Sequence, residues 1–228
     1  VAQHRESLYV GYRYYDAAGK AVRYPFGHGL SYARFAYSGL SVQRAGEQLV
    51  VRCRIENVGS MTAAETVQLY LAPPRKVAFA PPQILTGFAR RTLAPGEAAE
   101  ITFTLARRDV SYYSPAGKCW KVEGGVYELR LGASSRDIRL RAAIEWPGDD
   151  VCPADAANWA ACPHYAKVDG VFPKEEFERL LGWAVPCYRP PQKGEYTLNT
   201  MPEELASCRA GRALLCGIRC FLRWRCRR

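Results

Sequence analysis

The middle of the chain alternates hydrophobic and polar side chains in short runs. Between residues 40 and 146, apolar residues take every second position, as Val51, Cys53 and Ile55 do on either side of Arg52 and Arg54. The same alternation recurs at Val67, Leu69 and Leu71, at Ile101, Phe103 and Leu105, at Tyr127, Leu129 and Leu131, and at Ile138, Leu140 and Ala142. A period of two with one apolar face predicts half-buried antiparallel strands.

Turn-forming residues separate these runs and set the fold class. They stand at 57–59, 94–97, 115–117 and 124–125, where Gly, Pro and Asn are concentrated. With further strands expected near 85–92 and 110–122, the segment holds seven or eight strands in roughly 105 residues. We therefore expect a mainly β protein with an immunoglobulin-like antiparallel sandwich over residues 33–146.

The pattern differs at both ends of the chain. Residues 1–32 are rich in tyrosine and strand-like, and after Trp146 the stretch 147–150 (PGDD) is a typical linker. We expect a helix over 173–181, between Pro173 and Gly182. A second helix is expected over 201–226, opened by the capping pair Thr200 and Glu203. These signals divide the chain into 1–32, 33–146 and a helical extension, 147–228, with residues 186–191 extended between the helices.

Charge is distributed unevenly along the chain. The formal net charge is +10, from 32 Lys and Arg against 22 Asp and Glu. Residues 147–206 carry five basic and ten acidic groups, whereas residues 207–228 carry seven arginines and no acidic group. The high isoelectric point is therefore partly a property of the last 22 residues, and it does not indicate a nucleic-acid-binding protein as a whole.

The nine cysteines favour a reducing compartment. Their number is odd, their spacing is irregular and no C-x-x-C pair occurs. We favour free thiols and a bacterial cytoplasmic protein, with disulfides confined to the C-terminal third as the alternative. No run of 18 apolar residues is present, and the first 30 residues lack the apolar core of a signal peptide. The chain opens on Val1, which suggests a piece of a longer polypeptide.

Two groups of motifs point to a known family. Residues 8–16 (LYVGYRYYD) and 24–32 (YPFGHGLSY) resemble the signature that closes the α/β sandwich domain of glycoside hydrolase family 3, chiefly β-glucosidases. Residues 81–88 (PPQILTGF), 93–97, 107–113 and 132–138 (GASSRDI) resemble the fibronectin type III-like domain of the same enzymes. Residues 172–177 and 196–199 are similar to tails of some bacterial members. The resemblance implies a C-terminal fragment: a remnant with the last strand region of the α/β domain, then the sandwich, then a helical extension.

The resemblance also implies the activity of the whole enzyme. Family 3 β-glucosidases release terminal, non-reducing β-D-glucose with two carboxylates and without a metal or organic cofactor. Both catalytic carboxylates would lie upstream of this chain, and none of Glu6, Asp16, Asp109 and Asp137 matches a catalytic position. We therefore assign no catalytic, substrate-binding, cofactor or metal residue and expect this chain alone to be inactive. Its partners would be the upstream catalytic domains and, through them, a β-glucoside.

Several features have a second interpretation. His28 could shuttle protons, but a histidine in a glycine-flanked turn is more often structural. The cluster of Tyr9, Tyr12, Tyr14, Tyr15, Tyr24 and Tyr32 could bind sugars, although we favour a domain interface. The loop over 73–82, with Phe79 near its centre, is interpreted as docking against the missing domain, and less readily as a rim of the sugar site.

Other classes of protein receive less support. No G-x-S-x-G, P-loop or G-x-G-x-x-G motif occurs. Zinc bound by Cys152, Cys162, His164 and Cys187 would need an unusual ligand spacing. The main alternative is a free-standing immunoglobulin-like module that binds carbohydrate or protein without catalysis. The tyrosine-rich N-terminus would be an odd addition to such a module.

The basic tail, 201–228, has three possible destinations. Its arginines could contact nucleic acid, which we do not favour, or an anionic membrane surface beside Leu214, Ile218, Phe221, Leu222 and Trp224. We favour docking onto the body of the enzyme, with a membrane surface second.

Overall fold

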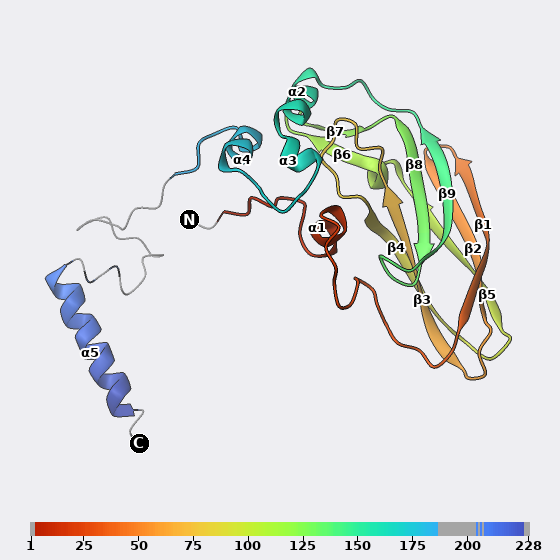
Figure 1. Cartoon of the computed structure of the whole chain (residues 1–228), viewed down its shortest axis with the longest axis horizontal. Helices are drawn as coiled ribbons and strands as arrows, with labels where there is room; N and C mark the ends of the chain where they lie inside the picture. The colour runs from red at the N-terminus through yellow and green to blue at the C-terminus, as the bar shows by residue number, and fades with distance from the viewer. Residues whose placement is uncertain (1–2, 187–203, 205, 207, 226–228) are drawn as a thin grey trace. The chain divides into compact units, whose positions relative to one another are not determined.

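A computed structural model of the chain describes residues 3–186, 204, 206 and 208–225. It divides into two compact units, residues 4–183 and residues 1–3 with 184–228, which are considered separately. The first unit contains a β-sandwich (Figure 1). One sheet has the order β1-β2-β5: β1 (Phe35–Ala45), β2 (Gln48–Asn57) and β5 (Ala98–Leu105). The other has the order β4-β3-β8-β9: β4 (Ile84–Leu93), β3 (Ala63–Ala72), β8 (Gly125–Gly132) and β9 (Ile138–Trp146). The predicted mainly β, antiparallel sandwich is confirmed.

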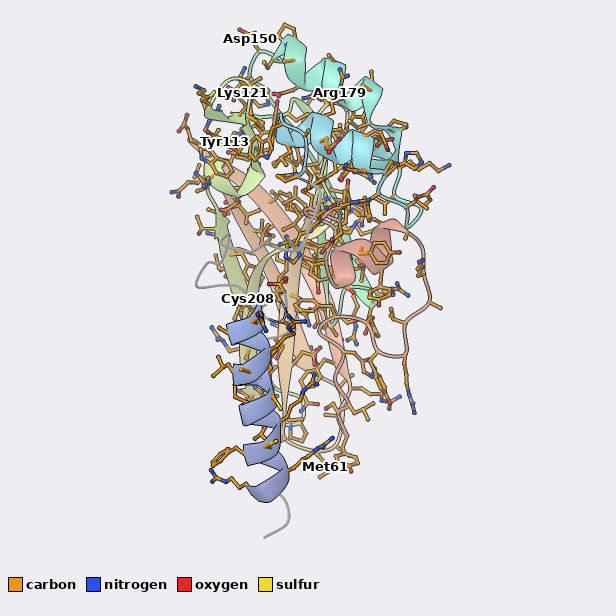
Figure 2. All side chains as sticks on the ribbon, turned by 90° about the vertical axis from the view of Figure 1, so that its left-hand side faces the viewer. Met61, Tyr113, Lys121, Asp150, Arg179 and Cys208 are labelled. Carbon is orange, nitrogen blue, oxygen red and sulfur yellow. The ribbon has the colours of Figure 1, made fainter. Side chains whose placement is uncertain are left out.

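A small hairpin caps one end of the sandwich. It consists of β6 (Ser111–Ser114) and β7 (Cys119–Val122), preceded by the 3-10 turn η1 (Arg107–Val110). Lys121 donates a hydrogen bond from Nζ to the carbonyl oxygen of Asp150 (2.8 Å). Figure 2 shows Lys121 and Asp150 at this end of the unit and Met61 at the other.

The core lies between the two sheets and follows the alternation in the sequence. Val51 is paired with Phe103 and Cys53 with Ile101 across β2 and β5, and all four side chains are buried. Leu129 and Leu131 are buried on the facing sheet, whereas Leu140 on the edge strand β9 is only partly buried. Leu140 was expected inside the core and instead packs against its margin.

Strand β3 departs from simple alternation. Val67, Leu69 and Leu71 face the core as predicted, but Gln68 and Tyr70, expected on a solvent face, are 5% and 0% exposed. The outer face of β3 is covered by residues 12–27, which lie far away in the sequence. A pattern within one strand carries no information about such a distant cover.

The N-terminal residues do not form the expected strand. In the described part of the chain before Phe35, the regular element is the short helix α1 (Tyr12–Ala17). Gly11, at φ +56°, turns the chain into this helix. A strand is stabilised by hydrogen bonds to a neighbouring strand, and the tyrosine side chains pack on the sandwich instead. The prediction of a strand region in residues 1–32 is therefore wrong for the described residues.

Three helices follow the sandwich within the same unit. They are α2 (Pro153–Ala161), α3 (Pro163–Ala166) and α4 (Lys174–Leu181). Helix α4 lies where the sequence predicts one; Glu175 and Glu176 stand in its first turn and Gly182 ends it at φ +85°. The compact unit ends after Trp183, whereas the boundary expected from the sequence lies at residue 146.

The second unit contains one long helix, α5 (Arg209–Arg225). It lies within the range 201–226 predicted to be helical, and it begins after Cys208. The proposed cap at Thr200 and the extended stretch after Pro186 lie outside the described residues. Among the described helices, none is long and apolar enough to cross a membrane.

Candidate functional site

Residues 8–32, here called the tyrosine segment, form a layer on the sandwich. The hydroxyl oxygen of Tyr12 accepts a hydrogen bond from the backbone N–H of Leu85 (2.9 Å), and Ser135 N–H donates to the carbonyl of Phe26 (2.9 Å). The rings of Tyr12 and Phe26 stack with centroids 4.5 Å apart, and Tyr12 meets Tyr70 of β3 edge-on at 6.2 Å. Backbone and ring contacts together fix the segment on the outer face of the sheet.

Gly27 shows why the motif around it requires glycine. Its φ is +78°, and a Cβ built there would lie 2.1 Å from Oε1 of the buried Gln68. The Gln68 amide donates hydrogen bonds to the carbonyls of Gly27 (3.2 Å) and Ala133 (2.7 Å), and Tyr70 donates to its oxygen (2.5 Å). The glycine therefore permits both the turn and the close approach to Gln68.

A polar network joins three of the sequence motifs. Arg136 donates from Nε to Oδ1 of Asp16 (3.0 Å) and from Nη2 to the carbonyl of Lys20 (2.7 Å). The buried Gln83 amide donates to the carbonyl of Ser135 (2.6 Å) and to Oδ2 of Asp16 (3.3 Å). The Asp16 side chain is 12% exposed. Residues of the 8–16, 81–88 and 132–138 motifs thus meet at one point.

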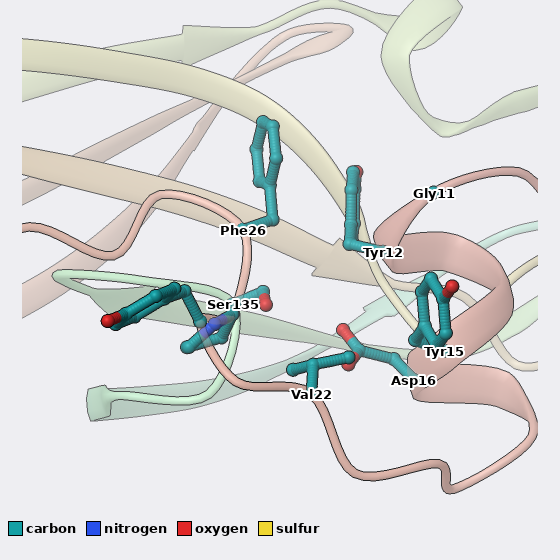
Figure 3. Close-up of a pocket in the computed structure, with 9 residues that line it drawn as sticks. Gly11, Tyr12, Tyr15, Asp16, Val22, Phe26 and Ser135 are labelled. Atoms are coloured by element: carbon teal, nitrogen blue, oxygen red, sulfur yellow. The ribbon is translucent and has the colours of Figure 1, made fainter.

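A cavity of about 220 Å³ lies beside this network (Figure 3). Its lining comprises Gly11, Tyr12, Tyr15, Asp16, Val22, Tyr24, Pro25, Phe26 and Ser135. Asp16 is the one carboxylate among these lining residues, and it already binds Arg136 and Gln83. A retaining glycosidase requires two carboxyl groups roughly 5–5.5 Å apart. This cavity has no such pair.

A second, smaller core joins the tyrosine segment to the helices after the sandwich. Tyr9 is 1% exposed and donates its hydroxyl to the carbonyls of Tyr165 (2.6 Å) and Ala80 (3.3 Å). Tyr165 in turn donates to the carbonyl of Arg5 (2.5 Å). Burial raises the pKa of Tyr9 and raises that of Tyr165 to about 12, so both hydroxyls stay protonated donors at neutral pH. Phe172 packs against both rings.

The loop over residues 73–82 packs on this chain itself. Phe79 stacks on Trp159 of α2 (5.2 Å) and meets Tyr165 edge-on (5.9 Å). The buried Glu123 carboxylate accepts hydrogen bonds from backbone N–H groups of the loop, including Val77 (2.9 Å). The extension therefore covers part of Phe79, and the predicted docking of the 73–82 loop against a missing domain stays a prediction. The sequence could not show that residues 153–166 fold back onto this side chain.

Two of the four candidate zinc ligands, Cys162 and His164, contact Glu176 instead. His164 Nδ1 lies 2.5 Å from Oε1 of Glu176, which holds α3 against α4 and raises the histidine pKa. Cys162 is buried, and burial raises the pKa of its thiol. Cys187 lies outside the described residues, within which no cluster of three metal-ligating side chains occurs. All seven cysteines in the described part of the chain are free thiols.

Apolar side chains of the tyrosine segment remain at the surface. Leu30 and Tyr32 are 94% and 97% exposed, and Tyr24 and Phe26 are 63% and 45% exposed. We call these four residues the aromatic face. His28 is exposed beside them: its ring stacks on Tyr24 (5.4 Å) and its N–H closes a turn to the Pro25 carbonyl. Four large apolar side chains exposed within nine residues make this stretch a candidate interaction surface.

Comparison with known proteins identifies the region. Residues 65–135 match the family model described as "Fibronectin type III-like domain". Thermostable beta-glucosidase B of Acetivibrio thermocellus is 41% identical over 146 residues, which cover 62% of this chain and 19% of that protein. Beta-glucosidase 3B of Thermotoga neapolitana superposes with a TM-score of 0.59 and 44% identity, over 61% of this chain and 19% of that one. The chain is similar to part of the β-glucosidase-type enzymes of glycoside hydrolase family 3.

Two further relatives extend this match. The family 3 β-glucosidase of Bifidobacterium adolescentis superposes with a TM-score of 0.62 and 34% identity, over 92% of this chain and 25% of that one. The exo-alpha-(1->6)-L-arabinopyranosidase of Bifidobacterium longum is 38% identical over 169 residues, covering 72% of this chain and 22% of that protein. The chain thus spans about a fifth of the length of the curated relatives, and the sequence-based recognition of the family is confirmed.

Sequence reasoning found the motifs that this chain shares with its relatives but not their contacts. Asp16 and Arg136 were both inside recognised motifs, and nothing in their spacing indicated that they pair across 120 residues. Gln83, Glu123 and the pair of His164 and Glu176 were missed as well. One signal in the sequence could have indicated these contacts. It is a charged or amide residue that lies inside a motif and does not belong to the alternation of a strand.

Proposed function

We propose that this chain is the non-catalytic, bracing part of a β-glucosidase-type glycoside hydrolase. The whole protein would hydrolyse terminal, non-reducing β-D-glucosyl residues, and the upstream domains of the same polypeptide would supply both catalytic carboxylates. The sandwich would hold the tyrosine segment in place, and the tyrosine segment would dock on those domains.

One observation carries this proposal: the aromatic face is exposed on a segment that is otherwise firmly held. Asp16, Gly27 and Tyr12 anchor the segment to the sandwich through their contacts with Arg136, Gln68 and Leu85. Leu30 and Tyr32 nevertheless leave almost their whole side chains in water. A preorganised segment loses little conformational entropy on docking, which favours an interface between domains.

The relatives support an accessory role for this region. β-Glucosidases and an arabinopyranosidase are similarly identical to it, at 41% and 38%. The names of these proteins refer to different sugars, although the matched region is about equally conserved in both. We therefore propose that the choice of sugar is made outside this chain.

The proposal predicts that the isolated 228-residue chain does not hydrolyse an aryl β-glucoside. Both catalytic carboxylates are expected in the upstream domains. Asp16, the carboxylate in the cavity, already binds Arg136 and Gln83. The measurement is release of a chromogenic phenol, with Asp16→Asn and Glu6→Gln variants as matched controls. We expect all three proteins to equal the buffer rate. Turnover that either substitution abolishes would assign catalysis to this chain and overturn the proposal.

A further inference from the structure

Helix α5 combines two faces of opposite character. Leu214, Ile218 and Phe221 follow each other at steps of four and three, and Leu222 lies four residues after Ile218; these four side chains form the α5 apolar face and are 43–55% exposed. Arg212, Arg219 and Arg223, spaced by seven and four residues, form the α5 basic face, and all three are exposed. Figure 1 shows α5 as one continuous helix.

Charge in this region has one sign. The last acidic residue of the sequence is Glu204, so α5 contains arginines and no carboxylate. A helix on the surface of a globular protein usually carries both acidic and basic side chains, and pairs of opposite charge one turn apart stabilise it. Within α5 the arginines have no acidic side chain to pair with, so an anionic surface would complement their charge.

We infer that α5 is an interfacial helix that binds an anionic lipid surface. Basic side chains on one face and Leu, Ile and Phe on the other are the composition of helices that lie in the headgroup layer. Seventeen residues give a helix about 26 Å long, enough to lie in the plane of a bilayer. Arginine side chains can keep their charge at the phosphates while their stems cover apolar surface.

The apolar face favours lipid over nucleic acid. Phosphate groups of either partner could bind Arg212, Arg219 and Arg223. Binding to DNA would leave Leu214 and Ile218 in water, whereas insertion into the headgroup layer buries them. Two glycines, Gly211 and Gly217, lower the intrinsic stability of the helix, and burial of one face at an interface compensates for this loss.

Vesicle co-sedimentation of the full 228-residue chain tests the inference. The probes are vesicles of phosphatidylcholine alone and of phosphatidylcholine with one quarter phosphatidylglycerol. We expect binding to the anionic vesicles, weakened by added salt, and little to the neutral ones. Each arginine near such a surface contributes about fivefold to partitioning. Arg219→Gln with Arg223→Gln should therefore weaken binding about 30-fold.

Two further variants separate lipid insertion from simple charge attraction. The matched control, Arg90→Gln with Arg91→Gln on strand β4, removes the same charge and should bind as the unaltered chain does. Ile218→Ser should weaken binding to anionic vesicles although it changes no charge. If the anionic vesicles do not bind, or if both arginine pairs behave alike, the inference is wrong.

Binding to another partner would also overturn it. Nucleic acid is the partner if a DNA duplex binds the chain and anionic vesicles do not. Docking onto the protein itself is indicated if Ile218→Ser lowers the melting temperature of the chain without any change in vesicle binding.

Discussion

Replacing Phe103 with alanine is expected to lower the free energy of unfolding of the chain by about 3–5 kcal/mol. Phe103 lies on β5 between the sheets and is 8% exposed. Across the sandwich it packs on Gly87, where an added Cβ would lie 2.9 Å from its ring. The glycine of the 81–88 motif thus provides the space that this ring fills, and truncation would leave a cavity that the backbone cannot easily close.

Phe88 supplies the matched control for this substitution. It neighbours Gly87 on β4 but is 70% exposed, so Phe88→Ala should change the free energy of unfolding by less than about 0.5 kcal/mol. Phe103→Leu, which keeps most of the volume, should cost less than about 1.5 kcal/mol. Urea titrations followed by tryptophan fluorescence, to which the buried Trp146 contributes, measure all three. Equal midpoints for Phe103→Ala and Phe88→Ala would show that the faces of these strands are assigned wrongly.

Replacing Arg136 with alanine is expected to cost about 2 kcal/mol. The substitution removes donors to Asp16 and to the carbonyl of Lys20 and leaves a carboxylate that is 12% exposed with a weaker set of partners. Because these contacts hold the tyrosine segment on the sandwich, the substitution should destabilise this segment locally as well as lower the stability of the whole fold. Hydrogen exchange should accelerate in residues 12–27 more than in the core strands.

Arg52→Ala is the control for the loss of an arginine. Arg52 also faces a carboxylate, Glu100, but at 3.9 Å and on an exposed surface. Such pairs contribute between 0 and about 1 kcal/mol. If Arg136→Ala and Arg52→Ala have the same effect on unfolding and on exchange, the network does not hold the tyrosine segment.

The sandwich could be predicted because its cause is local. Alternation at Val51, Cys53 and Ile55 fixes which face of a strand is buried, whatever the neighbours are. The prediction failed where distant residues decide burial. Gln68 and Tyr70 are buried because the tyrosine segment covers them, and no pattern within β3 indicates that cover.

The candidate site was harder to predict than the core. The sequence identified residues 8–32 as unusual and favoured a domain interface, but a dense run of tyrosines is also compatible with a sugar site or a strand. Packing decides: Tyr9 and Tyr12 face inward and donate or accept hydrogen bonds, whereas Tyr32 faces water. The pairing of Asp16 with Arg136 needs the three-dimensional fold, because the two residues are 120 positions apart in the sequence.

The proposed bracing role requires that the tyrosine segment docks on the upstream domains of the proposed full-length polypeptide, here called the parent. The most direct test compares the melting temperatures of the parent and of the isolated 228-residue chain. Leu30→Asp with Tyr32→Asp places charges on the aromatic face, and Val58→Asp with Met61→Asp places them on exposed apolar residues elsewhere. Docking predicts that the first pair destabilises the parent, by about 1.5–3 kcal/mol for each buried side chain, and leaves the isolated chain unchanged. The second pair should leave both unchanged. An unaltered melting temperature of the parent carrying the first pair would contradict the proposed bracing role.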